Sequence, residues 1–106
     1  MGAAVNEANR IVADTLFTPR PHKYTRADAA LNDKGELVSW HRAIRAAHEY
    51  HAADPHTHGE RTTASEALTR AVRALVHDHG DDPSGPHAVN LATHAVETAA
   101  GTLGMP

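Results

Sequence analysis

Residues 63–80 read TASEALTRAVRALVHDHG, and their apolar side chains recur every three or four positions. That spacing places one apolar stripe along a helix, because a helical turn takes 3.6 residues. Thr63, with Glu66 three residues later, forms a capping box, so we expect the helix to begin at Ala64. His79-Gly80 is a typical helix end, because glycine readily adopts a left-handed backbone. The predicted buried stripe is Ala64, Leu68, Ala71, Val72, Leu75 and Val76.

Similar stripes predict a helix on each side of this one. Ser39 is a suitable N-cap for a helix over residues 40–53, and Asp54-Pro55 ends it. After the turn-rich residues 80–86, a helix is expected from Pro86 or His87 to Ala100. The predicted apolar stripes are Trp40, Ala43, Ile44, Ala47 and Tyr50 in the first helix, and Ala88, Val89, Ala92, Ala95, Val96 and Ala99 in the second.

The N-terminal third of the chain combines a helical pattern with a turn signal. Residues 3–17 predict an amphipathic helix, which the prolines at 19 and 21 stop. Residues 27–38 predict a short β-hairpin-like excursion, with Asn32-Asp33-Lys34-Gly35 as its turn. Gly35 is suited to a left-handed position in that turn.

We therefore expect an all-α fold, with four amphipathic helices in a compact bundle and the hairpin-like excursion between helices one and two. The length of 106 residues predicts one domain, 1–106, with residues 101–106 frayed at the C-terminus. The core is thin, because 21 residues are alanine and only 17 are Leu, Ile, Val or Phe. A small core gives marginal stability, so we expect a homodimer or another protein partner.

Composition and charge exclude several functional classes. The absence of cysteine excludes disulfides, thiolate metal sites and a cysteine nucleophile. No apolar run approaches the ~20 residues of a membrane span, and the start MGAAVNEANR lacks the features of a signal peptide, so we expect no membrane contact and a cytoplasmic location. Residues 1–53 carry net charge +1 and residues 54–106 carry −4, so neither half has the positive excess of a nucleic-acid binder and we expect no nucleic-acid partner.

The stretch Tyr24 to Ala47 resembles a family of small uncharacterised actinobacterial helical domains. The family pattern has an aromatic residue, an Asp-x-x-Gly turn and a Cys-x-x-Gly-Ala-Ile helix start. Tyr24 matches the aromatic position, Asp33 and Gly35 match the turn with a shorter gap, and Ala43-Ile44 match the Ala-Ile pair. Ser39 and Arg42 stand where the family has cysteine and glycine. The resemblance implies a small helical domain of unknown activity.

Ten histidines are the unusual feature of the composition, and four of them cluster in sequence. His48 and His51 are neighbours at i,i+3 on a helix, and His56 and His58 follow in the loop behind it. Neutral imidazole is a common ligand of zinc, nickel and copper, so Zn, Ni or Cu are the ions that this set would bind. The alternative is that His51 faces the core and the other three are solvated.

The remaining histidines have simpler interpretations. His79 falls on the apolar side of its helix and near its end, where a cation is favoured, but His51 is the only histidine expected to face the core. His22, His77, His87 and His94 are expected to be solvent residues. Candidate ligand or interface residues are Trp40, Ile44, His87, Leu91 and His94.

The sequence favours a small non-enzymatic interaction or accessory protein. A histidine-based metal-binding protein, using His48, His51 and His56 or His58, is the first alternative. The second is a small enzyme in which His51 acts as acid–base in a pocket between two helices. A basic cluster in residues 20–26, with Arg42 and Arg45, is either a solvated surface or a contact for an anionic partner.

Overall fold

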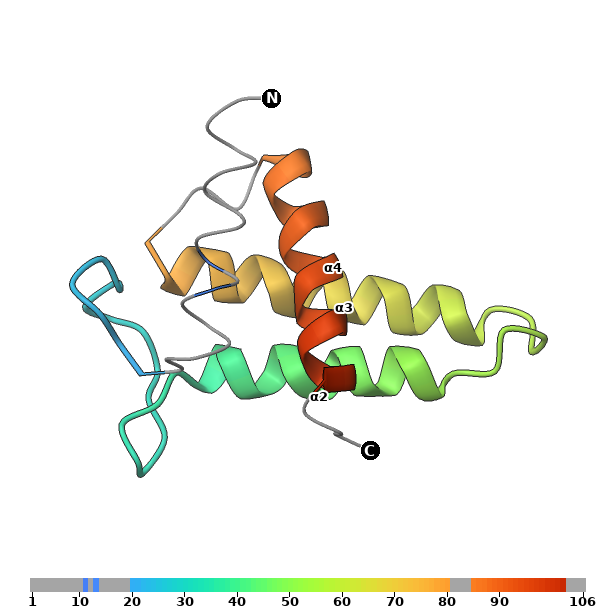
Figure 1. Ribbon diagram of the computed structural model, residues 1–106, viewed down its shortest axis with the longest axis horizontal. Helices are drawn as coiled ribbons and strands as arrows, with labels where there is room; N and C mark the ends of the chain where they lie inside the picture. The colour runs from blue at the N-terminus through green and yellow to red at the C-terminus, as the bar shows by residue number, and fades with distance from the viewer. Residues whose placement is uncertain (1–10, 12, 14–19, 81–84, 103–106) are drawn as a thin grey trace.

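The computed structural model describes residues 11, 13, 20–80 and 85–102. These residues form three helices and no strand: α2 (Val38–Ala52), α3 (Glu60–Asp78) and α4 (Pro86–Thr102). Figure 1 shows α2 and α3 running side by side in opposite directions, joined by a short loop. Helix α4 lies across both and packs against each of them. The mainly helical fold predicted from sequence is confirmed for this part of the chain.

The core lies where the three helices meet, and the predicted stripes supply it. Four of the five alanines of α4 are buried, with Ala92 at 0% exposure, and their small side chains permit close helix packing, whereas Ala95 is half-buried. Ile11, 1% exposed, joins the same cluster. Its main members are Trp40, Ala43, Ile44 and Ala47 from α2, Leu68, Val72, Leu75 and Val76 from α3, and Val89, Ala92, Val96, Ala99 and Ala100 from α4.

Two of the predicted helix starts are wrong. Helix α3 begins at Glu60, four residues before Ala64, because left-handed Gly59 (φ 82°) and the turns of the preceding loop lead directly into it. The Thr63 capping box therefore lies inside the helix. Helix α2 begins at Val38, with Leu37 at the N-cap position and no side-chain cap. Ser39 is buried, and its hydroxyl has no hydrogen-bond partner among the described residues.

Of the predicted β-hairpin-like excursion, only the turn is present. Gly35 has the expected positive φ of 76°, and its N–H donates to the Asn32 carbonyl at 3.0 Å. The flanking residues form only an isolated antiparallel bridge between Leu31 and Leu37. Strands do not develop, because the chain turns into α2 at Val38, immediately after the bridge.

The chain ends lie mostly outside the described residues. Of the predicted helix over residues 3–17, only Ile11 and Ala13 are described, and both are helical. The four-helix prediction is therefore not confirmed. Helix α4 continues through Gly101 to Thr102, and residues 103–106 lie outside the description, so the predicted fraying of residues 101–106 stays a prediction. Among the described helices, none has the length and apolar character needed to cross a membrane.

Candidate functional site

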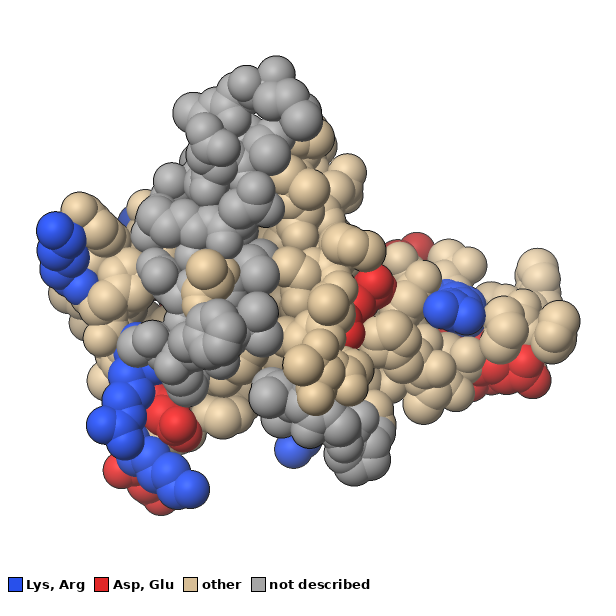
Figure 2. Space-filling view, viewed as in Figure 1, with Lys and Arg blue, Asp and Glu red and all other residues tan. Residues whose placement is uncertain are grey.

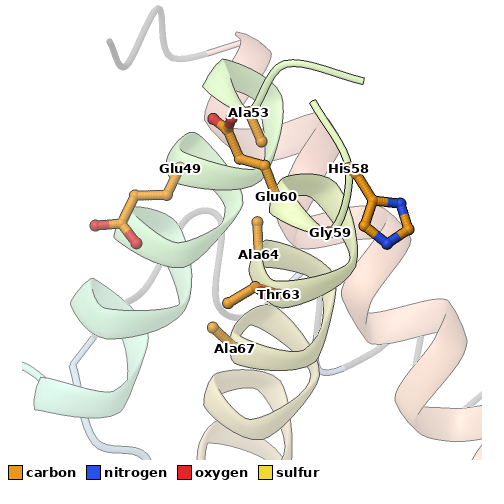
Figure 3. Close-up of a pocket in the computed structure, with 8 residues that line it drawn as sticks. All are labelled: Glu49, Ala53, His58, Gly59, Glu60, Thr63, Ala64 and Ala67. Atoms are coloured by element: carbon orange, nitrogen blue, oxygen red, sulfur yellow. The ribbon is translucent and has the colours of Figure 1, made fainter. Parts of the chain in front are cut away.

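A hollow lies where α2 ends and α3 begins (Figure 3). We call it the acidic groove, and its volume is about 590 Å³, within the size range of known binding sites. Small side chains of the two helices form much of its lining, and Glu49 and Glu60 supply the acidic groups. The lining residues are Glu49, Ala53, His58, Gly59, Glu60, Thr63, Ala64 and Ala67.

The loop at the end of the groove is shaped by Asp54. Its carboxylate accepts hydrogen bonds from the His56 N–H at 2.8 Å and from the Thr57 hydroxyl at 2.9 Å. These bonds favour the ionised form, so they hold the pKa of Asp54 below its usual range, with the His56 bond the larger cause. The carboxylate of Glu60 accepts the Asp54 N–H at 3.2 Å, which ties the loop to the start of α3.

We expect Asp54 to give the protein an acid-sensitive contribution to stability. Folding lowers the pKa of Asp54, so its ionised carboxylate stabilises the fold at pH values above the pKa of the unfolded chain. This contribution disappears as the pH falls through the lower pKa of the folded protein. Asp54→Asn should therefore lose less stability than the wild type between about pH 5 and pH 3. Urea unfolding midpoints at the two pH values measure the difference. Parallel losses in the two proteins would contradict a stabilising role of the charge.

A cation–π contact holds the two helices together beside the groove. The Arg61 guanidinium lies 4.5 Å from the centroid of the Tyr50 ring, a distance at which the ring face attracts a cation. The Nε atom of Arg61 is buried and has no hydrogen-bond partner among the described residues. This contact joins the last two turns of α2 to the first turn of α3, beside the groove.

The polar side chains of the acidic groove do not converge on one point in this structure. In Figure 3, Glu49 and His58 point away from one another, and the Glu60 carboxylate lies near Ala53. General acid–base catalysis needs its groups within hydrogen-bond reach of one reacting atom. Here the three polar groups surround a lining of small residues instead of converging on one point.

A second, smaller hollow lies at the other end of α2. We call it the basic hollow; it has a volume of about 260 Å³ and is lined by Asn32, Val38, His41, Arg42 and Arg45. Beside it, His41 Nε2 and Glu36 Oε1 are 3.1 Å apart. The side-chain hydrogen bond from Asn32 is the main cause that holds the pKa of Glu36 below its usual range, and His41 adds to it.

The predicted metal ligands occupy separate positions around the end of α2. His48 is half-buried, whereas His51, His56 and His58 are exposed. Within the described residues, no group of three or more His, Cys, Asp or Glu side chains is placed to hold a metal ion. Binding of Zn, Ni or Cu by these histidines stays a prediction.

The prediction that His51 faces the core is wrong. His51 is exposed, and its Nε2 lies 3.2 Å from the Glu97 carbonyl oxygen of α4. Helix α4 crosses α2 instead of lying along it, so the last turn of α2 is not covered on that face. His51 bridges two helices here, and it does not line the acidic groove. Its role as an acid–base group has no support from this arrangement.

The other candidate ligand or interface residues divide into two sets. Trp40 and Ile44 are core residues at 5% and 2% exposure, which leaves them little surface for a ligand. On α4, Leu91 is half-buried between exposed His87 and His94. Contact of this α4 face with a partner stays a prediction.

Sequence reasoning missed one pair of histidines. His22, expected in solvent, is half-buried, and its Nε2 lies 2.6 Å from Nε2 of His79. His79 is only 2% exposed, so His79, and not His51, is the buried histidine among the described residues. The signal for His79 was present, because it follows Leu75 and Val76 at helical spacing. No pattern in the sequence linked it to His22, 57 positions away.

Comparison of the chain with protein-family models, with curated proteins and with solved structures found no match. The resemblance of Tyr24–Ala47 to the actinobacterial family therefore stays a prediction.

Proposed function

We propose that this chain is a small non-enzymatic interaction protein that pairs with a second copy of itself through α2. The observation that carries the proposal is the opposite charge of the two hollows at the ends of this helix. The acidic groove contains Glu49 and Glu60, and the basic hollow contains Arg42 and Arg45. The acidic groove of one copy and the basic hollow of another therefore carry opposite charges, which favour association of the two surfaces.

The charged residues share one face of α2. Arg42, Arg45 and Glu49 are spaced at i, i+3 and i+7, which places them on one side of a helix. None of the three forms an ion pair with another described residue. They are therefore available to a partner without breaking an existing contact.

Two antiparallel copies of α2 would form two symmetric contacts between an arginine of one copy and a glutamate of the other. Arg42 and Glu49 are seven residues apart, or about 10.5 Å along the helix axis. A two-fold axis across the middle of this span brings Arg42 of one copy toward Glu49 of the other, and the reverse contact follows by symmetry. The small alanine side chains of the groove allow the partner helix to approach closely.

The charge distribution over the molecule supports the same arrangement. In Figure 2, acidic side chains lie at the tip where α2 and α3 are joined. Most of the visible Lys and Arg side chains lie toward the opposite end, mixed with acidic ones. Exposed ion pairs contribute about 0.2–1 kcal/mol each and are screened by salt. We therefore expect a weak, salt-sensitive dimer whose charges determine the register.

A charge-swap experiment tests the pairing. Glu49→Arg alone and Arg42→Glu alone should each weaken self-association about tenfold, because both symmetric contacts become repulsive. An equimolar mixture of the two variants should recover association, since the attraction is restored at both contacts. Sedimentation velocity over a range of protein and salt concentrations measures all three samples.

Two results would reject the proposal. One is a wild-type protein that remains monomeric at all concentrations in low salt. The other is a mixture that associates no better than the separate variants. Circular dichroism of each variant provides the folding control, and Arg70→Glu, an exposed residue of α3 that lines neither hollow, serves as a charge-matched surface variant that leaves α2 unchanged.

A further inference from the structure

Two arginines of α2 line the basic hollow with their charges unpaired. Arg42 and Arg45 are exposed, and neither forms an ion pair or a side-chain hydrogen bond with the described residues. They are neighbours at i,i+3 on the helix surface, so their two positive charges repel one another. An anion bound between the two guanidinium groups would relieve this repulsion.

The turn before α2 supplies a further hydrogen-bond donor to the hollow. The side-chain oxygen of Asn32 accepts the backbone N–H of Lys34 at 2.9 Å and of Glu36 at 3.0 Å, which fixes the orientation of its amide group. The amide nitrogen donates one hydrogen to Glu36 Oε1 at 3.1 Å. Because this nitrogen carries two hydrogens, the second is left for a ligand in the hollow that Asn32 lines.

The acidic residue beside the hollow is already engaged by the protein. Glu36 Oε1 accepts the hydrogen bond from Asn32 and lies 3.1 Å from His41 Nε2. The bond from Asn32 is the main cause that lowers the pKa of Glu36, and His41 and Lys34 also lower it. Among the described residues that line the hollow, none is acidic.

The start of α2 adds to the positive potential of the hollow. Val38, the first residue of the helix, belongs to the lining. The helix has no side-chain cap and no acidic residue in its first turn. Its N-terminal partial positive charge is therefore not offset by a side chain of the first turn, and it acts in the same direction as the two arginines.

We propose that the basic hollow is a binding site for a phosphate group, held between the guanidinium groups of Arg42 and Arg45. A phosphate presents oxygens in several directions, so it can accept a bidentate hydrogen bond from each of two guanidinium forks, whereas one fork is enough for a carboxylate. The volume of about 260 Å³ suits a small anion, because it lies below the range of sites for drug-sized ligands. A free phosphate ion and a phosphate monoester offer the same oxygens.

A second pair of arginines provides an internal comparison. Arg70 and Arg73 have the same i,i+3 spacing on α3 and line another hollow, of about 350 Å³. Glu66, one helical turn before Arg70, lines that hollow as well. Its carboxylate would repel a phosphate and attract the arginine that follows it. We therefore expect no phosphate site there, and the α3 pair is the matched control.

The phosphate site shares Arg42 with the proposed pairing of α2 but does not rest on that pairing. Glu49→Gln separates the two proposals, because Glu49 does not line the basic hollow. This variant should weaken self-association, since the partner carboxylate is lost. Its affinity for phosphate should stay within about twofold of the wild type, because a screened surface charge one turn away has a small effect.

Titration with inorganic phosphate, followed by ¹H–¹⁵N NMR, tests the site. Chloride keeps the ionic strength constant, because screening alone changes exposed charge contacts. We expect saturable shift changes in the millimolar range at the backbone amides of residues 38–42 and at the Nε–H groups of Arg42 and Arg45. Arg42→Gln and Arg45→Gln should each raise the dissociation constant about tenfold, whereas Arg70→Gln should leave it unchanged.

A second titration with methyl phosphate distinguishes the two sources of the ligand. Equal affinity for both probes would identify a phosphate monoester as an accepted ligand. Binding of inorganic phosphate alone would restrict the site to the free ion. Both results support a phosphate site, and circular dichroism checks that each variant is folded.

Three outcomes would overturn the proposal. The first is the absence of saturable shift changes around the hollow, or equal changes at Arg70 and Arg73, which would indicate a general effect of surface charge. The second is acetate binding as tightly as phosphate, which would contradict recognition by two forks. The third is loss of phosphate binding in Glu49→Gln, which would show that one copy does not form the site.

Discussion

Gly80→Ala is expected to reduce the free energy of unfolding by about 2–5 kcal/mol. Gly80 has φ of 92°, a left-handed conformation that alanine adopts at a cost of about 1–2 kcal/mol. A methyl group at this position would also overlap the Tyr24 carbonyl oxygen. Backbone atoms cannot rotate away, so either the segment that contains Tyr24 or the end of α3 must move. Urea unfolding followed by circular dichroism measures the loss.

Gly35→Ala is the matched control for this variant. Gly35 has a similar φ of 76°, but a methyl group there meets no atom within 4 Å. We expect this variant to cost only the conformational term of about 1–2 kcal/mol. The difference between the two variants isolates the contact with Tyr24. Equal losses at the two positions would show that this contact does not constrain the fold.

Leu75→Ala is expected to destabilise the protein by about 3–5 kcal/mol. Leu75 is fully buried at 0% exposure in the middle of the core cluster. Removing three carbons there loses burial of apolar surface and leaves a cavity that the packed helices fill only partly. Domains of this size have a total stability of about 5–15 kcal/mol, so the variant should be close to unfolding. The urea midpoint at 25 °C provides the measurement.

Leu31→Ala makes the same chemical change at the surface. Leu31 is 49% exposed in the turn before α2, and we expect a loss below about 1 kcal/mol. Because both variants remove the same atoms, the comparison separates burial from intrinsic differences between leucine and alanine. A similar loss at both positions would place Leu75 outside the cooperative core.

The apolar periodicity was enough to predict the core faces of the three described helices. The stripes through Leu68, Val72 and Leu75 in α3 and through Trp40 and Ile44 in α2 are buried as expected. The prediction works because apolar residues that recur every 3.6 positions lie on one side of a helix, and that side is buried whichever element packs against it. Helix starts were predicted less well. A capping residue such as Thr63 stabilises a start, but the loop before it determined that α3 begins at Glu60.

The candidate site was largely missed. His58 was singled out as a metal ligand, yet it lines a groove whose other walls, including Glu49, Ala53 and Glu60, had no sequence signal. The groove depends on how α2 and α3 lie against one another, and the spacing of residues within one helix carries no information on that. The prediction that His51 faces the core was wrong for a related reason, since the burial of His51 depends on where α4 crosses α2.

The sequence alone determined that the chain is mainly helical and which side of each described helix is apolar, because both follow from short-range periodicity. It also determined the left-handed turn at Gly35 and the helix end at Gly80, because only glycine takes these conformations without strain. The tertiary structure alone decided which histidines meet. His22 and His79 are 57 residues apart and become neighbours only when the segment before α2 folds onto the end of α3. Contacts of that range depend on how the elements pack, which no local pattern encodes.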